Sequence, residues 1–209
     1  MNKEYIDLED LKIKYPDLKY NADKNILSGC IKIHKNCNDE LIDGCYDLLI
    51  DFNKSSIPLV YDINGYIKSS YQHKYLDGHL CLATDIEQYL FLNDCNKISL
   101  WIEKFVVSYF ITYEYYKRYG VFPFGEHSHG SKGIIEFYQN YFNFNSESNY
   151  KSLIEYILFK KFRGHDLCPC GSNKRIRACH KNVIIDAKHD KNIVLLSKYY
   201  KDKVLNAKD

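Results

Sequence analysis

The sequence predicts an α+β fold in which an antiparallel β-meander comes first and helices follow. Apolar and polar residues alternate with a period of two between residues 27 and 64, which is typical of strands with one buried face. Beyond residue 97, large apolar residues recur at three- and four-residue spacing, which is typical of amphipathic helices. Strands followed by helices favour an antiparallel sheet with its helices on one face.

The first elements are a short amphipathic segment and a meander. The segment lies within residues 1–20 and ends before Tyr15-Pro16. At least three strands are expected, around residues 31–33, 46–52 and 59–63, separated by Asn-, Asp-, Gly- or Ser-rich turns at 36–44 and 53–56.

The second half of the chain is predicted to be helical. Residues 65–96 show no clear periodicity. A long helix is expected over 97–118 with Gly120 as its stop, and a shorter one over 133–142. A third helix, capped by Ser146 or Ser148, runs to Phe162 before Gly164, and a last one covers 191–205.

The composition provides enough apolar residues for a core and almost no net charge. The 209 residues are 45% hydrophobic, and 29 basic against 27 acidic side chains give a formal net charge of +2. Nucleic-acid binders usually carry a clear basic excess, so this balance argues against nucleic acid as a partner. The start of the chain lacks an apolar leader and no run is long enough to span a bilayer, so no membrane association is expected.

Cysteine usage suggests a reducing compartment. Three of the eight cysteines belong to a Cys/His cluster near the C-terminus. The remaining five are an odd number in a chain without a leader, so we expect free thiols and a cytoplasmic location. These five are Cys30, Cys37, Cys45, Cys81 and Cys95.

The Cys/His cluster predicts a metal site. The run Cys168-Pro-Cys170-Gly-Ser-Asn-Lys-Arg-Ile-Arg-Ala-Cys179-His180 holds three thiols and one imidazole. This is the ligand set that Zn²⁺ takes in a closed tetrahedral site, so the expected cofactor is a structural zinc ion with no open position for chemistry. Pro169 and the Gly-Ser-Asn that follows Cys170 supply the tight turn between the ligands.

The run resembles the SEC-C motif, the zinc-binding tail of the SecA translocase and of other bacterial proteins. That motif reads Cys-Pro-Cys-Gly-Ser-Gly-Lys, then a short basic run and Cys-Cys or Cys-His. Asn173 replaces its second glycine, a mild change because Asn tolerates the left-handed conformation. The resemblance implies an attachment module. Its basic residues fit an acidic partner, RNA or simply a solvated face; they are Lys174, Arg175, Arg177 and Lys181.

The sequence therefore divides into three parts. Residues 1–163 form the main domain, 164–185 the zinc motif and 186–209 a C-terminal helix or tail.

A second candidate site surrounds Cys81. The run Gly78-His79-Leu80-Cys81-Leu82 lies in the aperiodic stretch, and Cys81 follows His73 by eight residues. A thiol with a free pKa of about 8.5 serves both as nucleophile and as leaving group, and a Gly-flanked loop would expose it. Either histidine could tune the thiolate or deprotonate an acceptor amine. The alternative is a small core strand, because free cysteine is among the most buried residue types.

The meander, the long loop, the histidine and Gly-x-Leu-Cys-Leu together resemble ubiquitin-conjugating (UBC) enzymes. The resemblance covers roughly residues 1–120 and implies a UBC-like meander with helices on one face. Lys74-Tyr75 replace the Pro-Asn that follows the family histidine. The oxyanion role of that asparagine is thereby left to Tyr75, His73, His79 or backbone N–H groups. UBC-like proteins of bacterial CBASS antiphage operons depart in this way, and the chain resembles them most.

This resemblance implies a thioester-forming transferase in antiviral defence. Cys81 would accept the C-terminal carboxyl group of a protein donor and pass it to an acceptor. The chain has no Gly-rich nucleotide loop, so a separate activating enzyme would be needed. The CBASS likeness implies a cGAS-like nucleotidyltransferase as donor.

The sequence also supports two other hypotheses. One is a non-catalytic UBC/RWD-like adaptor that uses its sheet and zinc motif to bind protein or RNA. The other is a SecB- or ribosome-associated targeting factor recognised through the zinc tail. Separately, the Glu126-His127-Ser128-His129 patch could bind a metal or form a polar loop before the next helix, with Ser131 as its cap.

Overall fold

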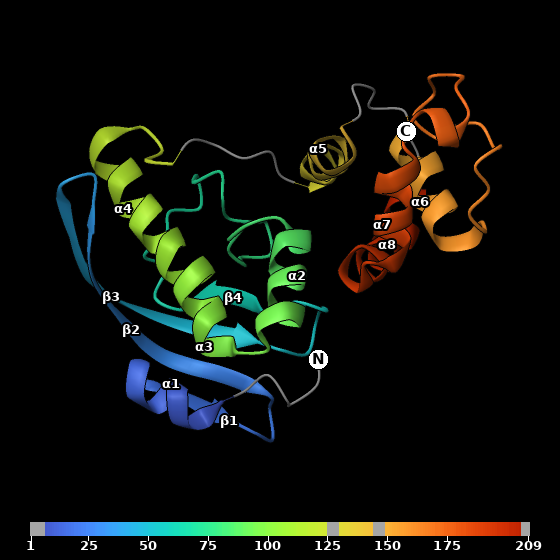
Figure 1. The fold of residues 1–209 in the computed structure, drawn as a ribbon. Coiled ribbons are helices and arrows are strands. Elements are labelled where there is room, and N and C mark those ends of the chain that lie inside the picture. The colour runs from blue at the N-terminus through green and yellow to red at the C-terminus, as the bar shows by residue number, and fades with distance from the viewer. Residues whose placement is uncertain (1–6, 125–129, 144–148, 206–209) are drawn as a thin grey trace. The chain divides into compact units, whose positions relative to one another are not determined.

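The computed structural model describes residues 7–124, 130–143 and 149–205, in two compact units (Figure 1). The first unit is Met1–His127 and the second is Ser128–Asp209. The sequence had placed the main boundary at residue 163. The difference arises because α5 (Gly130–Phe142) and α6 (Tyr150–Phe159) pack with the C-terminal helices. The Tyr138 and Ser197 hydroxyls bond at 3.0 Å, and Lys188 donates to the Ile157 carbonyl at 2.7 Å.

The first unit contains a four-stranded antiparallel sheet in the order β1-β2-β3-β4. This confirms the α+β class and the meander. The strands are β1 (Leu18–Asn21), β2 (Ile26–Cys37), β3 (Glu40–Asp51) and β4 (Leu59–Asp62). The β2–β3 turn is shorter than predicted: only Asn38 and Asp39 lie between the strands. Both have positive φ (48° and 64°), the backbone of a two-residue hairpin turn that matches strand twist.

One face of this sheet carries the core. Leu27 lies opposite Ile50 and Ile31 opposite Tyr46, and all four are buried. The intervening residues, such as Lys32, point to the other, largely exposed face. The period of two therefore predicted correctly which side of each long strand is buried.

A disulfide joins β2 and β3 on the exposed face. Cys45 lies opposite Lys32, two positions from Cys30, and the two cysteine Cα atoms are 6.0 Å apart, within the span of a disulfide. The expectation of free thiols at Cys30 and Cys45 is wrong, because antiparallel pairing makes these residues diagonal neighbours. It remains correct for Cys37, Cys81 and Cys95.

Helices cover the buried face of the sheet. The predicted long helix is present as α3 (Ile98–Trp101), a π-helical stretch η2 (Ile102–Val107) and α4 (Ser108–Tyr119), and Gly120 ends it with φ 70°. Figure 1 shows α4 crossing the sheet, where the Phe110 ring stacks on Tyr46 at 4.3 Å between centroids. Trp101 is fully buried in the same core.

Two shorter helices complete this unit. The predicted N-terminal segment forms α1 (Leu8–Lys14), which is tied to the long helix by a 2.8 Å bond from the Tyr15 hydroxyl to Glu103. Helix α2 (Asp85–Cys95) was not predicted, because its apolar residues form no clear stripe. The Thr84 hydroxyl caps it by accepting a hydrogen bond from the Glu87 amide at 3.3 Å.

The second unit is helical around the Cys/His run. Helix α6 ends at Phe159, earlier than Phe162, and starts after Asn149; Ser146 and Ser148 lie outside the described residues. A 3₁₀ turn η4 (Ile176–Ala178), α7 (Lys181–His189) and α8 (Lys191–Leu205) follow, and α8 has the predicted bounds. Among the described residues, no helix combines the length and apolar content that crossing a membrane requires.

Candidate functional sites: the Cys81 turn and the Cys/His cluster

The chain enters the Cys81 region through a tight turn beside β4. The Tyr75 amide donates to the His79 carbonyl at 2.9 Å, and the Gly78 amide to the Tyr75 carbonyl at 3.0 Å, where Gly78 adopts φ 90°. The Leu80 amide donates to the Val60 carbonyl at 2.7 Å. These bonds place the segment after the turn along the edge of β4.

Cys81 is buried at the end of this turn. Its side chain and backbone leave it 8% exposed, so the expected open thiol is not found in this conformation. The thiol donates to the Tyr75 hydroxyl at 3.4 Å, and the amide donates to the His73 carbonyl at 2.8 Å. Burial raises the pKa of the Cys81 thiol, an effect that the Tyr75 hydroxyl opposes. The resting thiol is therefore protonated near neutral pH.

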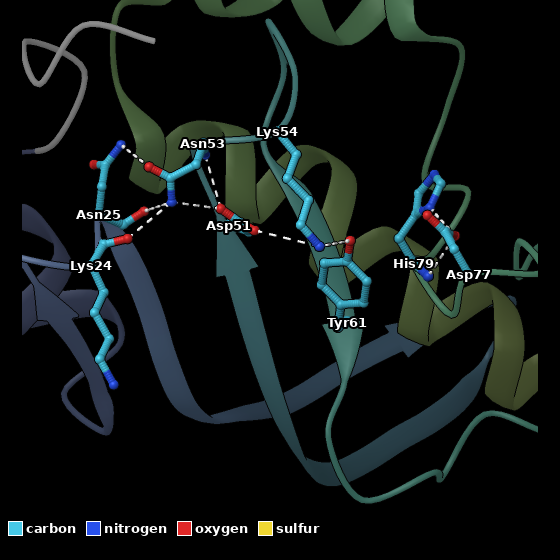
Figure 2. Close-up of polar contacts among 8 residues, drawn as sticks. All are labelled: Lys24, Asn25, Asp51, Asn53, Lys54, Tyr61, Asp77 and His79. Carbon is cyan, nitrogen blue, oxygen red and sulfur yellow. Dashed lines mark hydrogen bonds and ion pairs between the residues drawn. The ribbon is translucent and has the colours of Figure 1, made fainter.

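His79 and Asp77 form a pair next to Cys81. The His79 Nδ1 atom contacts the Asp77 carboxylate, and the His79 ring stacks on Tyr75 at 4.1 Å between centroids. Figure 2 shows this pair beside Tyr61, whose backbone bridges to His79. Since Tyr75 also contacts the thiol, an imidazole–carboxylate pair lies one ring away from Cys81.

A second polar group extends from Tyr61 to the end of β3. Lys54 donates to the Tyr61 hydroxyl at 3.3 Å and lies 3.9 Å from the Asp51 carboxylate (Figure 2). Asp51 also accepts from the backbone and side-chain nitrogens of Asn53, both at 2.8 Å. These bonds fix the β3–β4 connection next to the Cys81 turn.

His73 holds Cys81 through its backbone. The His73 carbonyl accepts from the Cys81 amide and from the Tyr109 hydroxyl, the latter at 3.0 Å. Its buried ring packs against Tyr71 and Phe122 at 5.3 and 5.1 Å between centroids. These contacts fit a residue that positions the loop, whereas His79 stands closer to the thiol's partner.

A pocket of about 320 Å³ lies in the first unit, next to the residues that pack on His73. Residues 68–72 form one wall and the C-terminal half of α4 the other. Its lining includes Tyr71, the ring that contacts His73, together with two lysines, Lys68 and Lys117.

The four predicted metal ligands come together in the second unit. One ligand atom from each of Cys168, Cys170, Cys179 and His180 lies within 4.8 Å of all the others. The Cys170 and Cys179 sulfurs are 3.6 Å apart, and His180 Nδ1 is 3.3 Å from the Cys168 sulfur and 3.1 Å from that of Cys179. Tetrahedral Zn–S bonds of about 2.3 Å would separate two sulfurs by about 3.8 Å, so the cluster could hold a metal ion of this size.

Burial and local hydrogen bonds shift the pKa values of these ligands, and the shift at Cys168 opposes the thiolate that a metal needs whereas those at Cys170 and His180 favour the metal-binding forms. Burial raises the pKa of Cys168 to about 12 when no metal is bound. Burial also acts to raise the pKa of Cys170, but hydrogen bonds with Ser172, Cys168 and Cys179 together outweigh it and the pKa is lowered. Burial lowers the pKa of His180, which favours the neutral imidazole that binds metals.

Two contacts not foreseen from the sequence support the cluster. The Ser172 hydroxyl lies 3.1 Å from the Cys170 sulfur and 3.4 Å from the Cys179 sulfur. The Asn149 side chain donates to the Cys170 carbonyl at 2.7 Å. Ser172 stands inside the motif and was therefore visible, but nothing in the sequence linked Asn149 to the cluster. Asn173 adopts the expected left-handed conformation, with φ 58°.

The His127/His129 patch lies outside the described residues. No protein-family model, curated protein or solved structure matches the chain.

Proposed function

We propose that the chain is a UBC-like transferase that forms a thioester on Cys81. The observation that carries the proposal is the assembly of Cys81, Tyr75, His79 and Asp77 on one turn between β4 and α2. The order of helix, four-stranded meander, cysteine turn and long helix supports it, since the UBC resemblance implies the same order.

The proposed reaction has two steps at one sulfur. Cys81 attacks the carbonyl carbon of a donor C-terminus held as a thioester on an activating enzyme; the new S–C bond forms, the old one breaks, and the proton leaves with the released thiol. An acceptor amine then attacks the same carbon, a C–N bond forms, and the Cys81 thiolate leaves. His79, oriented by Asp77, takes the proton of the amine.

Tyr75 has a defined part in this scheme. Its hydroxyl reaches the sulfur, so it is the side chain best located to donate to the oxyanion that forms beside that sulfur. It takes the role that asparagine has in the UBC enzymes. Because Cys81 is covered at rest, the donor complex has to displace the cover, and 42% of Tyr75 is exposed for such contact.

The same proposal includes a structural zinc ion in the second unit. Cys168, Cys170, Cys179 and His180 would hold it and leave no coordination site for a reactant. The SEC-C resemblance is the basis for this metal, and the CBASS resemblance is the basis for an antiviral role with a cGAS-like nucleotidyltransferase as donor.

A trapping experiment tests the transferase. Cys81→Ser, Cys81→Ala and wild-type proteins are expressed in the native host, and their intact masses are measured under denaturing conditions without hydroxylamine. The expected result is a base-labile added mass on the Ser variant and not on the Ala variant, because an oxyester turns over more slowly than a thioester. Three unmodified proteins would contradict the transferase.

The burial of Cys81 favours a second candidate, a non-catalytic adaptor of the UBC/RWD type. In that case Cys81 only packs, and the sheet or zinc motif binds a protein or RNA, as in SecB- or ribosome-associated targeting. Deletion of residues 166–209 would then abolish partner binding, whereas Cys81→Ala would leave it unchanged. The transferase hypothesis predicts the opposite for Cys81, because its replacement with Ala would abolish attachment of the donor.

A further inference from the structure

The chain as a whole is nearly neutral, but its two units carry formal charges of opposite sign. Residues 128–209 carry 15 basic and eight acidic side chains, a formal charge of +7. Residues 1–127 carry 14 basic and 19 acidic side chains, a formal charge of −5. The near-neutral charge of the whole chain therefore does not speak against a nucleic-acid partner for the second unit.

The positive charge is concentrated around the Cys/His cluster. Residues 160–181, which we call the basic lobe, contain seven Lys or Arg residues and one acid, Asp166. The Asp166 carboxylate contacts Tyr156, whose hydroxyl donates a hydrogen bond to it at 3.2 Å. A zinc ion with three thiolates and a neutral imidazole would change the charge of the lobe by about −1, which leaves a clear excess.

The fold brings the two ends of this lobe together. The Arg177 amide donates to the Gly164 carbonyl at 3.0 Å, and Leu167 bridges to Arg175. Arg163 and Arg177 are thus carried on neighbouring backbone segments, although 14 residues separate them in sequence. Each basic side chain of the lobe is exposed; they are Lys160, Lys161, Arg163, Lys174, Arg175, Arg177 and Lys181.

Among the described residues of the unit, these charges are not neutralised by ion pairs. Within the described ranges, Lys174, Arg175, Arg177 and Lys181 take part in no ion pair, whereas basic residues of the first unit form many. Two exposed apolar side chains accompany these cations. Phe159, directly before the lobe, is 61% exposed with the Lys201 Nζ atom 5.1 Å from its ring centroid, and Leu167, within the lobe, is 59% exposed. An exposed ring next to unpaired cations is the combination that single strands use, because bases stack while phosphates bind the cations.

We propose that the basic lobe binds single-stranded nucleic acid through its phosphate backbone. Single strands are favoured over duplexes because residues 160–180 form turns, one isolated bridge and a 3₁₀ turn, and helix α7 begins only at Lys181, so the lobe presents no full helix or two-stranded ribbon to a groove. The exposed ring favours nucleic acid over an acidic protein. This inference is independent of the proposed chemistry at Cys81.

The test measures binding of the full-length, zinc-loaded chain to a fluorescently labelled 20-nucleotide RNA and to DNA of the same sequence. Anisotropy is followed from 25 to 300 mM KCl. Each phosphate contact contributes about −0.7 to the slope of log K against log salt for a single strand. Replacing Lys174, Arg177 and Lys181 with Gln should therefore reduce the slope by about 2 and weaken binding about 100-fold at 0.1 M salt. The two probes distinguish RNA from DNA as the preferred strand.

A matched control removes the same charge elsewhere. Lys12, Lys19 and Lys24 are exposed in the first unit and take part in no ion pair among the described residues, so their replacement with Gln should change the affinity less than about twofold. If the first triple variant loses its metal, Lys160→Gln, Lys161→Gln and Arg163→Gln replace it, because these residues precede all four ligands.

Three results would overturn the inference. The first is no binding of wild type to either strand at 25 mM KCl. The second is equal weakening by the basic-lobe and control triples, which would show an effect of net charge alone. The third is binding of poly-glutamate or of vesicles with anionic lipid as tight as that of the strands, which would identify a general surface for polyanions.

Discussion

Removing the Tyr75 hydroxyl should make Cys81 a weaker nucleophile. Tyr75 donates to the thiolate once it forms, and this bond opposes the burial that raises the pKa of Cys81. A hydrogen bond to a charged group contributes about 1.5–3 kcal/mol, so Tyr75→Phe should raise this pKa by about one to two units. A thiolate of higher pKa is also a better nucleophile, and this offsets about half of the loss on a logarithmic scale. Alkylation at a pH below the pKa should therefore slow about 3- to 10-fold.

The assay is the rate of iodoacetamide alkylation of Cys81 in the folded protein, read from the peptide mass between pH 6 and 10. The wild-type rate should keep rising above pH 9, and the Tyr75→Phe curve should lie at higher pH. Tyr61→Phe is the control, because its hydroxyl bonds to Lys54 and not to the thiol. The free energy of unfolding of each variant is measured in urea, since alkylation through unfolding would follow it. An unchanged or faster rate in Tyr75→Phe alone would refute the reasoning.

Three further predictions concern stability. Gly171→Ala should destabilise the metal cluster by about 1–2 kcal/mol, because Gly171 has φ 75° and a Cβ would lie 2.5 Å from the Asn149 side chain. Zinc affinity is measured by competition with a chelating dye, and an unchanged affinity would contradict this prediction. Leu48→Ala should cost about 2–5 kcal/mol in urea unfolding, since Leu48 is fully buried under the helices, and a smaller loss would mean that this core collapses to fill the space. Denatured, unreduced protein should show six titratable thiols and reduced protein eight, with reduction of Cys30–Cys45 costing about 3 kcal/mol; eight thiols before reduction would contradict the disulfide.

The sequence predicted those elements whose pattern reflects a single buried face. Strands β2 and β3 are twelve residues each, long enough for alternation to be clear, and α8 was found because its apolar residues keep one spacing. Strand β1 has four residues, too few for a period, and it lacks the apolar run that revealed the equally short β4. Helix α2 is held by its Thr84 cap and its packing rather than by an apolar stripe. Local pattern cannot show such elements, because tertiary contacts define them.

The two candidate sites differ in the same way. The metal ligands lie within 13 residues, so their spacing determined that they meet. The partners of Cys81 depend on how a turn folds back along β4, and the sequence placed Tyr75 among several candidates without choosing it. The burial of Cys81 and the Cys30–Cys45 bond depend on neighbours that are distant along the chain or diagonal across strands.

The covered position of Cys81 also affects how the protein meets oxidative stress. Peroxide and electrophiles react with exposed thiolates, so a protonated thiol beneath a tyrosine is a slow target. Only an event that uncovers the sulfur would make it vulnerable, and in the proposed transferase this is the event that brings the thiol to its donor. The proposed transferase would thus keep its thiol intact while no donor is bound, and damage would accumulate only in proportion to use.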